Sequence, residues 1–320
     1  MALDGVADAV VRLLSEAKRV TVLVGAGVSV GSGIPDFRSP GGLYATLRPE
    51  LLTATESQRE LMRREPTAVV DWRLFSQNSL PYLEVRRPFI LGINRGQWKP
   101  SVGHLLIDEL AKRGTLRRLY SCNIDGLEHQ LRSVPKDKVV HCHGSLGQAS
   151  CEGCGAACEM GWFIERVQTQ IRDIYSVDAS APKVSTPIAC PQCRRPLVKP
   201  STVLYGRNLP GSFFEAMEQD FPDACDLVVV MGTSLTVGPA NRVPGLARPS
   251  TPRIIINNEP VGAELGIEYA KELKQGPDRR WSPAWSRAGR DFFLAGTCDE
   301  TVQQLASRLG WDDVLAAAVK

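Results

Sequence analysis

Short runs of apolar, mostly β-branched residues recur along the chain and predict the strands of a sheet. Several of these runs are apolar at every position. This is typical of parallel strands covered by helices on both faces, whereas a sheet with one wet face would alternate. The predicted strands are residues 20–24, 119–122, 139–142, 203–205, 227–231, 254–257 and 292–294.

Helical patterns lie between these runs. Residues 5–17, 102–112 and 300–309 repeat apolar positions three and four residues apart, and Gly114 follows the second of them as a helix stop. Strand and helix in alternation predict an α/β fold with a doubly wound, mostly parallel, Rossmann-like sheet.

Two stretches interrupt this alternation and predict a smaller second domain. Residues 43–114 are mostly helical and loop in character, and residues 151–200 hold two Cys-x-x-Cys pairs without a sheet-like pattern. Residues 266–290, rich in Pro, Arg and Trp, predict a surface loop. The expected division is a discontinuous Rossmann-like domain at 1–42, 115–147 and 201–320, a helical insertion at 43–114, and a cysteine-containing module at 148–200.

The composition is that of a globular protein. The 320 residues are 43% hydrophobic and 23% charged, which excludes collagen, coiled coil and a disordered chain. A net charge of +3 is too close to neutral for nucleic acid or an anionic membrane to be the main partner. The N-terminus has no signal-peptide pattern, and no run approaches the ~18 apolar residues of a membrane helix. We therefore expect a protein of the cytoplasm or nucleus that is not secreted.

The cysteines suggest a metal site. Cys151 and Cys154 form one Cys-x-x-Cys pair, and Cys190 and Cys193 form a second. Two such turns brought together close a tetrahedral zinc site, and four thiolates leave no position open for water, so the ion would be structural. A redox pair or a nucleic-acid-binding zinc ribbon are the alternatives. We interpret Cys158 as a bystander.

A glycine turn follows the first predicted strand. Gly25-Ala26-Gly27 would let backbone amides and a helix start face a pyrophosphate, so a dinucleotide is the first ligand to consider. The match to the dehydrogenase fingerprint is imperfect, because Val30 stands where a third glycine is expected and residues 45–50 do not form the strand that would carry an acidic ribose ligand. A tight turn without a ligand stays an alternative.

Two of the four histidines, His141 and His143, lie at the carboxyl end of a predicted strand. Open α/β sheets bind their ligands at that edge. A histidine there can be a general base, a structural group or a metal ligand. His104 and His129 lie on helical patterns and are interpreted as structural.

Six blocks, taken in order, resemble the sirtuin family. No single block is specific, but the six together cover about residues 5–310 in the order that this family has. They are 25–39 (GAGVSVGSGIPDFRS), 121–128 (SCNIDGLE), 143–145 (HGS), the paired Cys-x-x-Cys units, 232–235 (GTSL) and 257–259 (NNE).

The resemblance implies NAD-dependent removal of an acyl group from lysine. The acyl-lysine carbonyl oxygen would attack C1′ of the nicotinamide ribose and release nicotinamide, and His143 would act as general base on the ribose hydroxyls. The products would be free lysine and O-acyl-ADP-ribose, so NAD is consumed as a co-substrate beside one structural zinc ion. Partners would be acyl-lysine proteins, with histones as candidates, and no membrane.

The resemblance also implies site residues. His143, Asn123 and Asp125 would be catalytic, the last two bordering the nicotinamide pocket, and Phe37 would shield the reactive ribose from water. Ser234, Asn257 and Glu259 would hold the adenosine side. The full set of cofactor-binding positions is Gly25, Ala26, Gly27, Asp36, Phe37, Arg38, Cys122, Asn123, Asp125, Gly232, Thr233, Ser234, Asn257, Glu259 and Cys298. The substrate peptide would pair its backbone with strand-like edges at Val203, Leu204, Tyr205, Gly206 and Val237.

Two positions depart from the family pattern. Cys122 stands where the family usually has Gln, and a thiol cannot make the amide hydrogen bond to a ribose hydroxyl, so we expect weaker use of NAD. Arg207 stands where many relatives have an acidic residue. It would either favour acidic peptide flanks or be a solvated surface residue, and we favour the second. Residues 41–47 lack the basic and tyrosine pair of desuccinylating relatives, which favours acetyl or a longer apolar acyl group.

Two other functions stay open at this point. An ADP-ribosyltransferase or NAD-glycohydrolase on the same fold would share the loss of nicotinamide and differ in the nucleophile. A catalytically weak zinc-ribbon protein that binds nucleic acid is the second, because charge and aromatic rings interleave near the C-terminal end. The residues concerned are Arg279, Arg280, Trp281, Trp285, Arg287 and Arg290.

Overall fold

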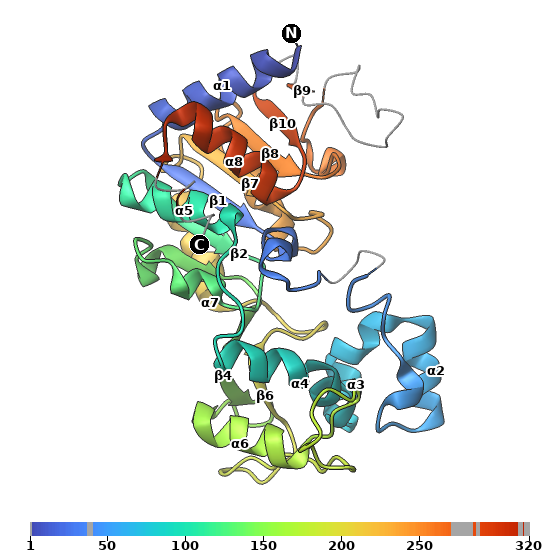
Figure 1. The fold of residues 1–320 in the computed structure, drawn as a ribbon. Coiled ribbons are helices and arrows are strands. Elements are labelled where there is room, and N and C mark those ends of the chain that lie inside the picture. The colour runs from blue at the N-terminus through green and yellow to red at the C-terminus, as the bar shows by residue number, and fades with distance from the viewer. Residues whose placement is uncertain (1, 37–40, 270–283, 286–288, 313–315, 317–320) are drawn as a thin grey trace.

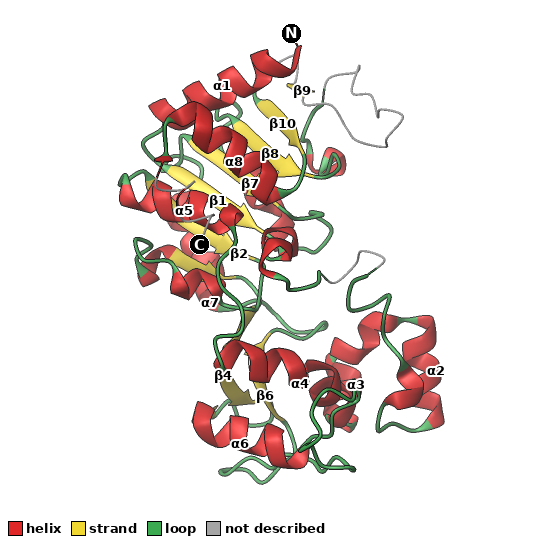
Figure 2. Cartoon of the chain, in the orientation of Figure 1, coloured by secondary structure: helices red, strands yellow, loops and turns green. Residues whose placement is uncertain are grey.

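A computed structural model describes residues 2–36, 41–269, 284–285, 289–312 and 316 (Figure 1). A larger lobe contains an open sheet between helices, and a smaller lobe lies beyond its lower edge in this view (Figures 1 and 2). No helix in the described ranges combines the length and the apolar character needed to cross a bilayer. Phe37, Arg38 and most of the predicted surface loop at 266–290, including Arg279, Arg280, Trp281 and Arg287, lie outside the described residues.

The large sheet has the order β3-β2-β1-β7-β8-β10-β9 in the described chain. All neighbours pair in parallel except β9, which is antiparallel at one edge. The chain runs from β1 outward to β2 and β3, then returns to fill the other side, so the switch in winding direction falls between β1 and β7. The strands are β1 (Val20–Val24), β2 (Leu116–Ser121), β3 (Val139–His141), β7 (Leu227–Met231), β8 (Arg253–Asn257), β9 (Ala284–Trp285) and β10 (Asp291–Ala295).

Helices cover both faces of this sheet, as the apolar runs predict. All five residues of β1 are buried, with Val22 in the core of one face and Leu23 in the core of the other. The first face is covered by α1 (Ala2–Glu16), α5 (Val102–Lys112) and α8 (Cys298–Leu309), and the second by α7 (Gly211–Asp220). The doubly wound α/β class and these three predicted helices, α1, α5 and α8, are therefore confirmed.

The small lobe is built on a three-stranded antiparallel sheet in the order β5-β4-β6. Its elements are α2 (Glu56–Arg64), α3 (Trp72–Gln77), α4 (Leu80–Asn94), β4 (Gly144–Cys151), β5 (Ala157–Cys158), α6 (Met160–Gln170) and β6 (Val198–Thr202). The helices from 56–94 and the segment with the cysteine pairs share one apolar core, which contains Phe75, Leu83, Phe163 and Val198. Helix α5, although inside the range 43–114, packs on the large sheet instead.

Two expectations about strands are wrong. Residues 151–200 do contribute to a sheet, but β6 reads VKPST and β4 reads GSLGQASC, so neither has the β-branched run that identifies a strand in sequence. The predicted strand at 203–205 begins only after β6 has ended, and among the described residues its β-pairing is limited to an isolated parallel bridge between Asp71 and Tyr205.

Candidate active site and cysteine cluster

Two glycine turns meet where the winding direction switches. The turn after β1 donates a hydrogen bond from the Gly27 amide to the carbonyl of Gly232, which follows β7, over 2.8 Å. A Cβ added to Gly27 would lie 2.7 Å from Gly232 Cα, and Gly232 itself has φ of +59°. Side chains are therefore excluded here by the close approach of two backbones. In open α/β sheets, ligands bind beyond the carboxyl ends of the strands at such a switch point.

A cavity of about 1100 Å³ opens at this edge, slightly above the usual range of ligand pockets, roughly 300–1000 Å³. The structure brings nearly all described candidate residues to it. Those expected at the cofactor and catalytic positions are Gly25, Ala26, Gly27, Asp36, Cys122, Asn123, His143, Gly232, Thr233, Ser234, Asn257, Glu259 and Cys298, and those expected at the peptide are Val203, Leu204, Tyr205, Gly206 and Val237. Asp125 lines a smaller pocket that shares Ala26 and Asn123 with this cavity.

His143 lies at the junction of the two lobes, between β3 and β4. Its Nδ1 is 3.0 Å from the carbonyl oxygen of Cys122. A carbonyl only accepts, so Nδ1 carries the proton and the neutral ring keeps Nε2 as an acceptor. Nε2 is buried and has no hydrogen-bond partner among the described residues.

The backbone around His143 is tightly held. The amide of Val203 donates to the His143 carbonyl over 2.8 Å. The next residue, Gly144, has φ of +74°, and a Cβ there would lie 1.8 Å from the carbonyl oxygen of Ser201. Only glycine fits this position, so the start of β4 fixes where the imidazole can lie.

The pKa of His143 reflects two opposing influences. Burial lowers it, but the neighbouring Cys122 side chain and carbonyl favour the protonated ring, and the net result is a pKa above the ordinary value. His141 differs, because burial lowers its pKa to about 4 and its ring packs 4.6 Å from that of His129. His104 is fully buried in α5 and caps the helix with Ser101. The structure thus places one of the four histidines, His143, in the cavity lining.

A buried polar network surrounds Asn123 and Asp125. The Asn123 side-chain amide donates to the Gly25 carbonyl over 3.1 Å and to Ser29 Oγ over 3.2 Å, while Ser29 donates to Asp125 over 2.8 Å. Asn123 Oδ1 is left buried without a partner in the described structure. Burial raises the pKa of the Asp125 carboxyl, and burial together with Asp125 raises the pKa of Glu128 to about 8.

Sequence reasoning missed some residues of the site. Ser29, inside the glycine block 25–39, links Asn123 to Asp125. Tyr82 and Arg86 of α4 line the cavity and are 2% and 6% exposed. The signal for Arg86 is that charged residues, Glu84, Arg86 and Arg87, stand together among the apolar positions of α4.

The adenosine-side candidates follow β7, β8 and β10. Ser234 Oγ lies 2.9 Å from Thr236 Oγ1, and the Asn257 side chain donates to the Glu259 carbonyl over 2.9 Å. Cys298 is the first residue of α8 and is 4% exposed. Burial raises the pKa of its thiol to about 12, so it is a neutral thiol in the cavity wall.

The candidate peptide segment is partly paired within the chain. The Tyr205 amide donates to Val70, and its carbonyl accepts from Trp72, each over 3.0 Å. Arg207 is exposed, in keeping with the surface position that we favoured, and it also makes specific contacts. Its guanidinium stacks 3.7 Å from the Trp72 ring centre, lies 3.4 Å from a Glu152 carboxylate oxygen, and lines the cavity.

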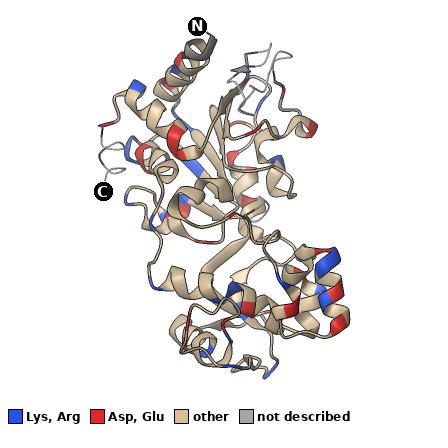
Figure 3. Ribbon diagram, turned by 45° about the vertical axis from the view of Figure 1, so that its right-hand side comes forward, with Lys and Arg blue, Asp and Glu red and all other residues tan. Residues whose placement is uncertain are grey.

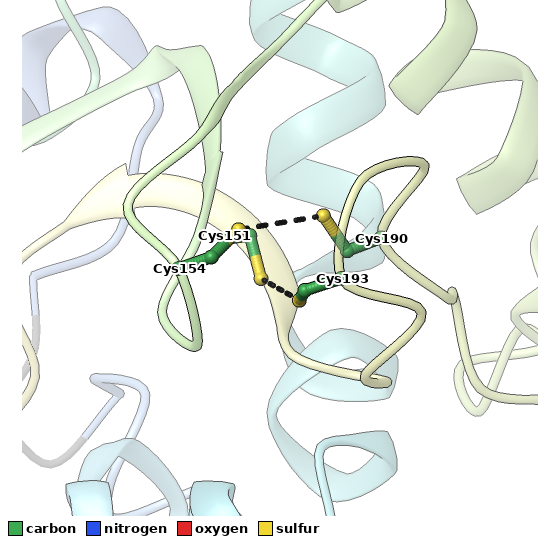
Figure 4. A group of neighbouring side chains, drawn as sticks. All are labelled: Cys151, Cys154, Cys190 and Cys193. Carbon is green, nitrogen blue, oxygen red and sulfur yellow. Dashed lines mark hydrogen bonds between the residues drawn. The ribbon is translucent and has the colours of Figure 1, made fainter.

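The four paired cysteines form a cluster in the small lobe (Figure 4). Cys151 Sγ is 3.6 Å from Cys193 Sγ, and Cys154 Sγ is 3.8 Å from Cys190 Sγ. Sulfurs bound to one zinc ion at 2.3 Å in tetrahedral geometry are about 3.8 Å apart, so the arrangement fits that ion. Cys158 lies in β5 outside the cluster, as expected of a bystander.

Comparisons with known proteins agree with this geometry. The model of the Sir2 family matches residues 25–239. NAD-dependent deacetylase sir2D of Dictyostelium discoideum is 33% identical over 95% of this chain, which spans 46% of that relative. NAD-dependent protein deacetylase sirtuin-2 of Danio rerio is 33% identical over 100% of the chain and 75% of its own length. NAD-dependent protein deacetylase hst2-1 of Emericella nidulans is 34% identical over 96% of the chain and 71% of its own length.

Proposed function

Since the chain belongs to the Sir2 family, we propose that it is an NAD-dependent protein-lysine deacetylase, which transfers the acyl group from lysine to ADP-ribose. The observation that carries this proposal is the unpartnered Nε2 of His143 in the same cavity as the two glycine turns. The transfer requires a general base, a binding site for the dinucleotide and an opening that admits the substrate peptide.

The proposed roles follow from the hydrogen bonds. NAD, when bound, supplies an electrophilic ribose carbon and the nicotinamide leaving group. The Cys122 carbonyl holds the His143 tautomer in which Nε2 accepts a proton, and this is the form that a general base needs. Asn123 has committed its amide hydrogens to Gly25 and Ser29, so its Oδ1 is left to accept from a donor on the ligand.

The remaining assignments are also proposals. Zinc would hold the small lobe through Cys151, Cys154, Cys190 and Cys193, without a catalytic role. Substrates would be acylated proteins, including histones, with acetyl or a longer apolar acyl group on lysine. We expect the protein in the cytoplasm or nucleus, where thiols stay reduced. Nucleic acid as the main partner is disfavoured by the interleaving of both charge signs, as in α2 (Figure 3), where Arg63 pairs with Glu56 and Glu60.

The test is the product formed from an acetyl-lysine peptide with and without NAD. Mass spectrometry should show free lysine and O-acetyl-ADP-ribose, and both should require NAD. ADP-ribose without transfer of the acetyl group would favour the glycohydrolase or ADP-ribosyltransferase alternative. Salt-sensitive DNA binding without any NAD turnover would favour the nucleic-acid alternative.

A further inference from the structure

Two cysteines stand side by side at the edge of the large sheet. In the parallel pairing of β2 with β3, Tyr120 lies opposite Val140 and Ser121 opposite His141. The Cys142 amide donates to the Ser121 carbonyl over 2.8 Å and extends this pairing by one step. Cys122 and Cys142 are therefore the next pair in register.

Their side chains lie on the same face of the sheet. Residues two apart along a strand share a face, so Cys122 follows Tyr120 and Cys142 follows Val140. All four belong to or pack against one apolar core. Paired residues on neighbouring strands have Cα atoms about 4.8 Å apart, within the range of 4.4–6.8 Å that a disulfide requires.

The two thiols have different surroundings. Cys122 lines the cavity and is half-buried, whereas Cys142 has no exposed surface. Hydrogen bonding from the Cys142 thiol, and then from His143, lowers the pKa of Cys122 to about 6 against the effect of burial. Burial raises the pKa of Cys142 well above its ordinary value. Cys122 is thus the thiol with the lower pKa at the cavity, and Cys142 is its fully buried neighbour.

In the proposed deacetylation neither sulfur takes part in a bond-making step. The base is His143, and the carbonyl of Cys122, not its sulfur, fixes the imidazole. We propose that Cys122 and Cys142 form a dithiol site for reversible oxidation by a hydroperoxide, with Cys122 as the attacking thiol and Cys142 as the resolving thiol.

The chemistry balances in two steps. The Cys122 thiolate attacks one peroxide oxygen, the O–O bond breaks, and with one proton the products are a sulfenic acid and the alcohol, or water if the oxidant is hydrogen peroxide. The Cys142 sulfur then attacks the sulfenic sulfur, an S–S bond forms, and water leaves. In sum, two thiols and one hydroperoxide give a disulfide, an alcohol and water. A dithiol reductant restores both thiols.

The disulfide would alter the catalytic edge. It removes the thiolate beside His143 and covalently joins the chain segments that carry Asn123 and His143. We therefore expect oxidation to lower deacetylation, and dithiothreitol to restore it. This activity effect rests on the proposed function, whereas formation of the disulfide does not.

The experiment treats the full-length, zinc-loaded protein with limiting hydrogen peroxide, alkylates the remaining thiols and maps the peptides by mass spectrometry. The expected result is a linkage between Cys122 and Cys142 that dithiothreitol reverses. Cys298, a thiol in the same cavity wall with a raised pKa, should stay alkylatable and is the internal control. Zinc release is followed in parallel to exclude oxidation of the cluster. A reduced Cys142 beside an oxidised Cys122, or no reaction at Cys122, would overturn the proposal.

Two variants separate the dithiol from general oxidation. Cys142→Ala should abolish the linkage and leave a sulfenic acid on Cys122 that dimedone traps. Cys225→Ser removes another buried thiol of the same core and should still form the linkage. If Cys142→Ala proves unfolded in a thermal melt, Cys122→Ser serves instead, and Cys142 should then resist peroxide. Oxidation of Cys142 in that variant would contradict its role as resolving thiol.

A final arm repeats the oxidation in the presence of NAD. Slower oxidation of Cys122 with NAD supports both the dithiol and the nucleotide site. Formation of the linkage at an unchanged rate supports the dithiol and counts against the proposed nucleotide site, so the two proposals fail separately.

Discussion

The two lobes are stabilised in different ways. The large sheet is covered on both faces by apolar cores, and β1 and β7 are buried at every position. The small lobe has one core, short strands that contain Gly, Pro and Lys, and four sulfurs placed to bind an ion. It also buries charge, since the fully buried Glu84 accepts hydrogen bonds from Thr53, Ser185 and Arg172. Apolar burial suffices for the first lobe, whereas the second depends on specific polar and metal contacts.

The candidate active site lies at the junction of the two lobes. His143 follows β3 of the large sheet and precedes β4 of the small one, and β4 ends at Cys151 of the cluster. The base is thus positioned by the apolar sheet on one side and by a metal-dependent strand on the other. Variants that act on one side only can separate the two contributions.

The largest effect should come from loss of zinc. Structural zinc contributes roughly 10–16 kcal/mol of apparent binding free energy in zinc-finger peptides. We expect chelation, or Cys193→Ser, to unfold the small lobe and abolish deacetylation, while amide protons of β1 and β7 stay protected in hydrogen exchange. Cys158→Ser, outside the cluster, is the matched control and should leave both unchanged. Loss of protection throughout the large sheet would show that the lobes do not unfold independently.

The next effect should be that of His143→Ala, which removes the base without a large change in packing. A general base contributes between about 10² and 10⁴ in rate. Turnover with an acetyl-lysine peptide should fall by that factor, while the melting temperature stays close to that of the parent. His129→Ala, an exposed histidine, should keep full activity. A comparable loss in both variants would remove His143 from its proposed role.

The pH dependence of deacetylation should show the effect of Cys122 on the pKa of His143. His143 acts as a base only when neutral, and its pKa is raised, so activity should fall as the pH drops through a value above the ordinary ~6.5. Cys122→Gln removes the thiolate that favours the protonated ring. The acid limb should therefore move to lower pH, and KM for NAD should fall because the amide can bond a ribose hydroxyl, worth about 0.5–1.5 kcal/mol. An unmoved limb and an unchanged KM would contradict both effects.

The smallest effect should be that of Arg207. Its charge lies 3.4 Å from Glu152 and its side chain is 40% exposed, and exposed ion pairs contribute only about 0.2–1 kcal/mol. Arg207→Gln should change the preference between acidic and basic peptide flanks by no more than about fivefold. A larger change in kcat/KM ratios would make Arg207 a determinant of specificity.

Features that depend on residues close together in the sequence could be predicted from it. Runs apolar on both faces identified the parallel strands, and the Cys-x-x-Cys spacing identified the cluster. Features that depend on tertiary packing were not accessible. These include the pairing of Tyr205 with Val70, the stacking of Arg207 on Trp72, and the single core shared by two segments of the small lobe. The place of Tyr82 in the cavity lining was not predicted, because an aromatic residue among the apolar positions of a helix ordinarily indicates core.

The central claim is that one cavity couples the loss of nicotinamide to the loss of the acyl group. The most direct measurement counts nicotinamide and free lysine in the same reaction of the zinc-loaded protein with NAD and an acetyl-lysine peptide. We predict one nicotinamide for each lysine released, with little nicotinamide when the peptide is omitted. Nicotinamide release at the same rate without peptide, or lysine release without NAD, would contradict the account.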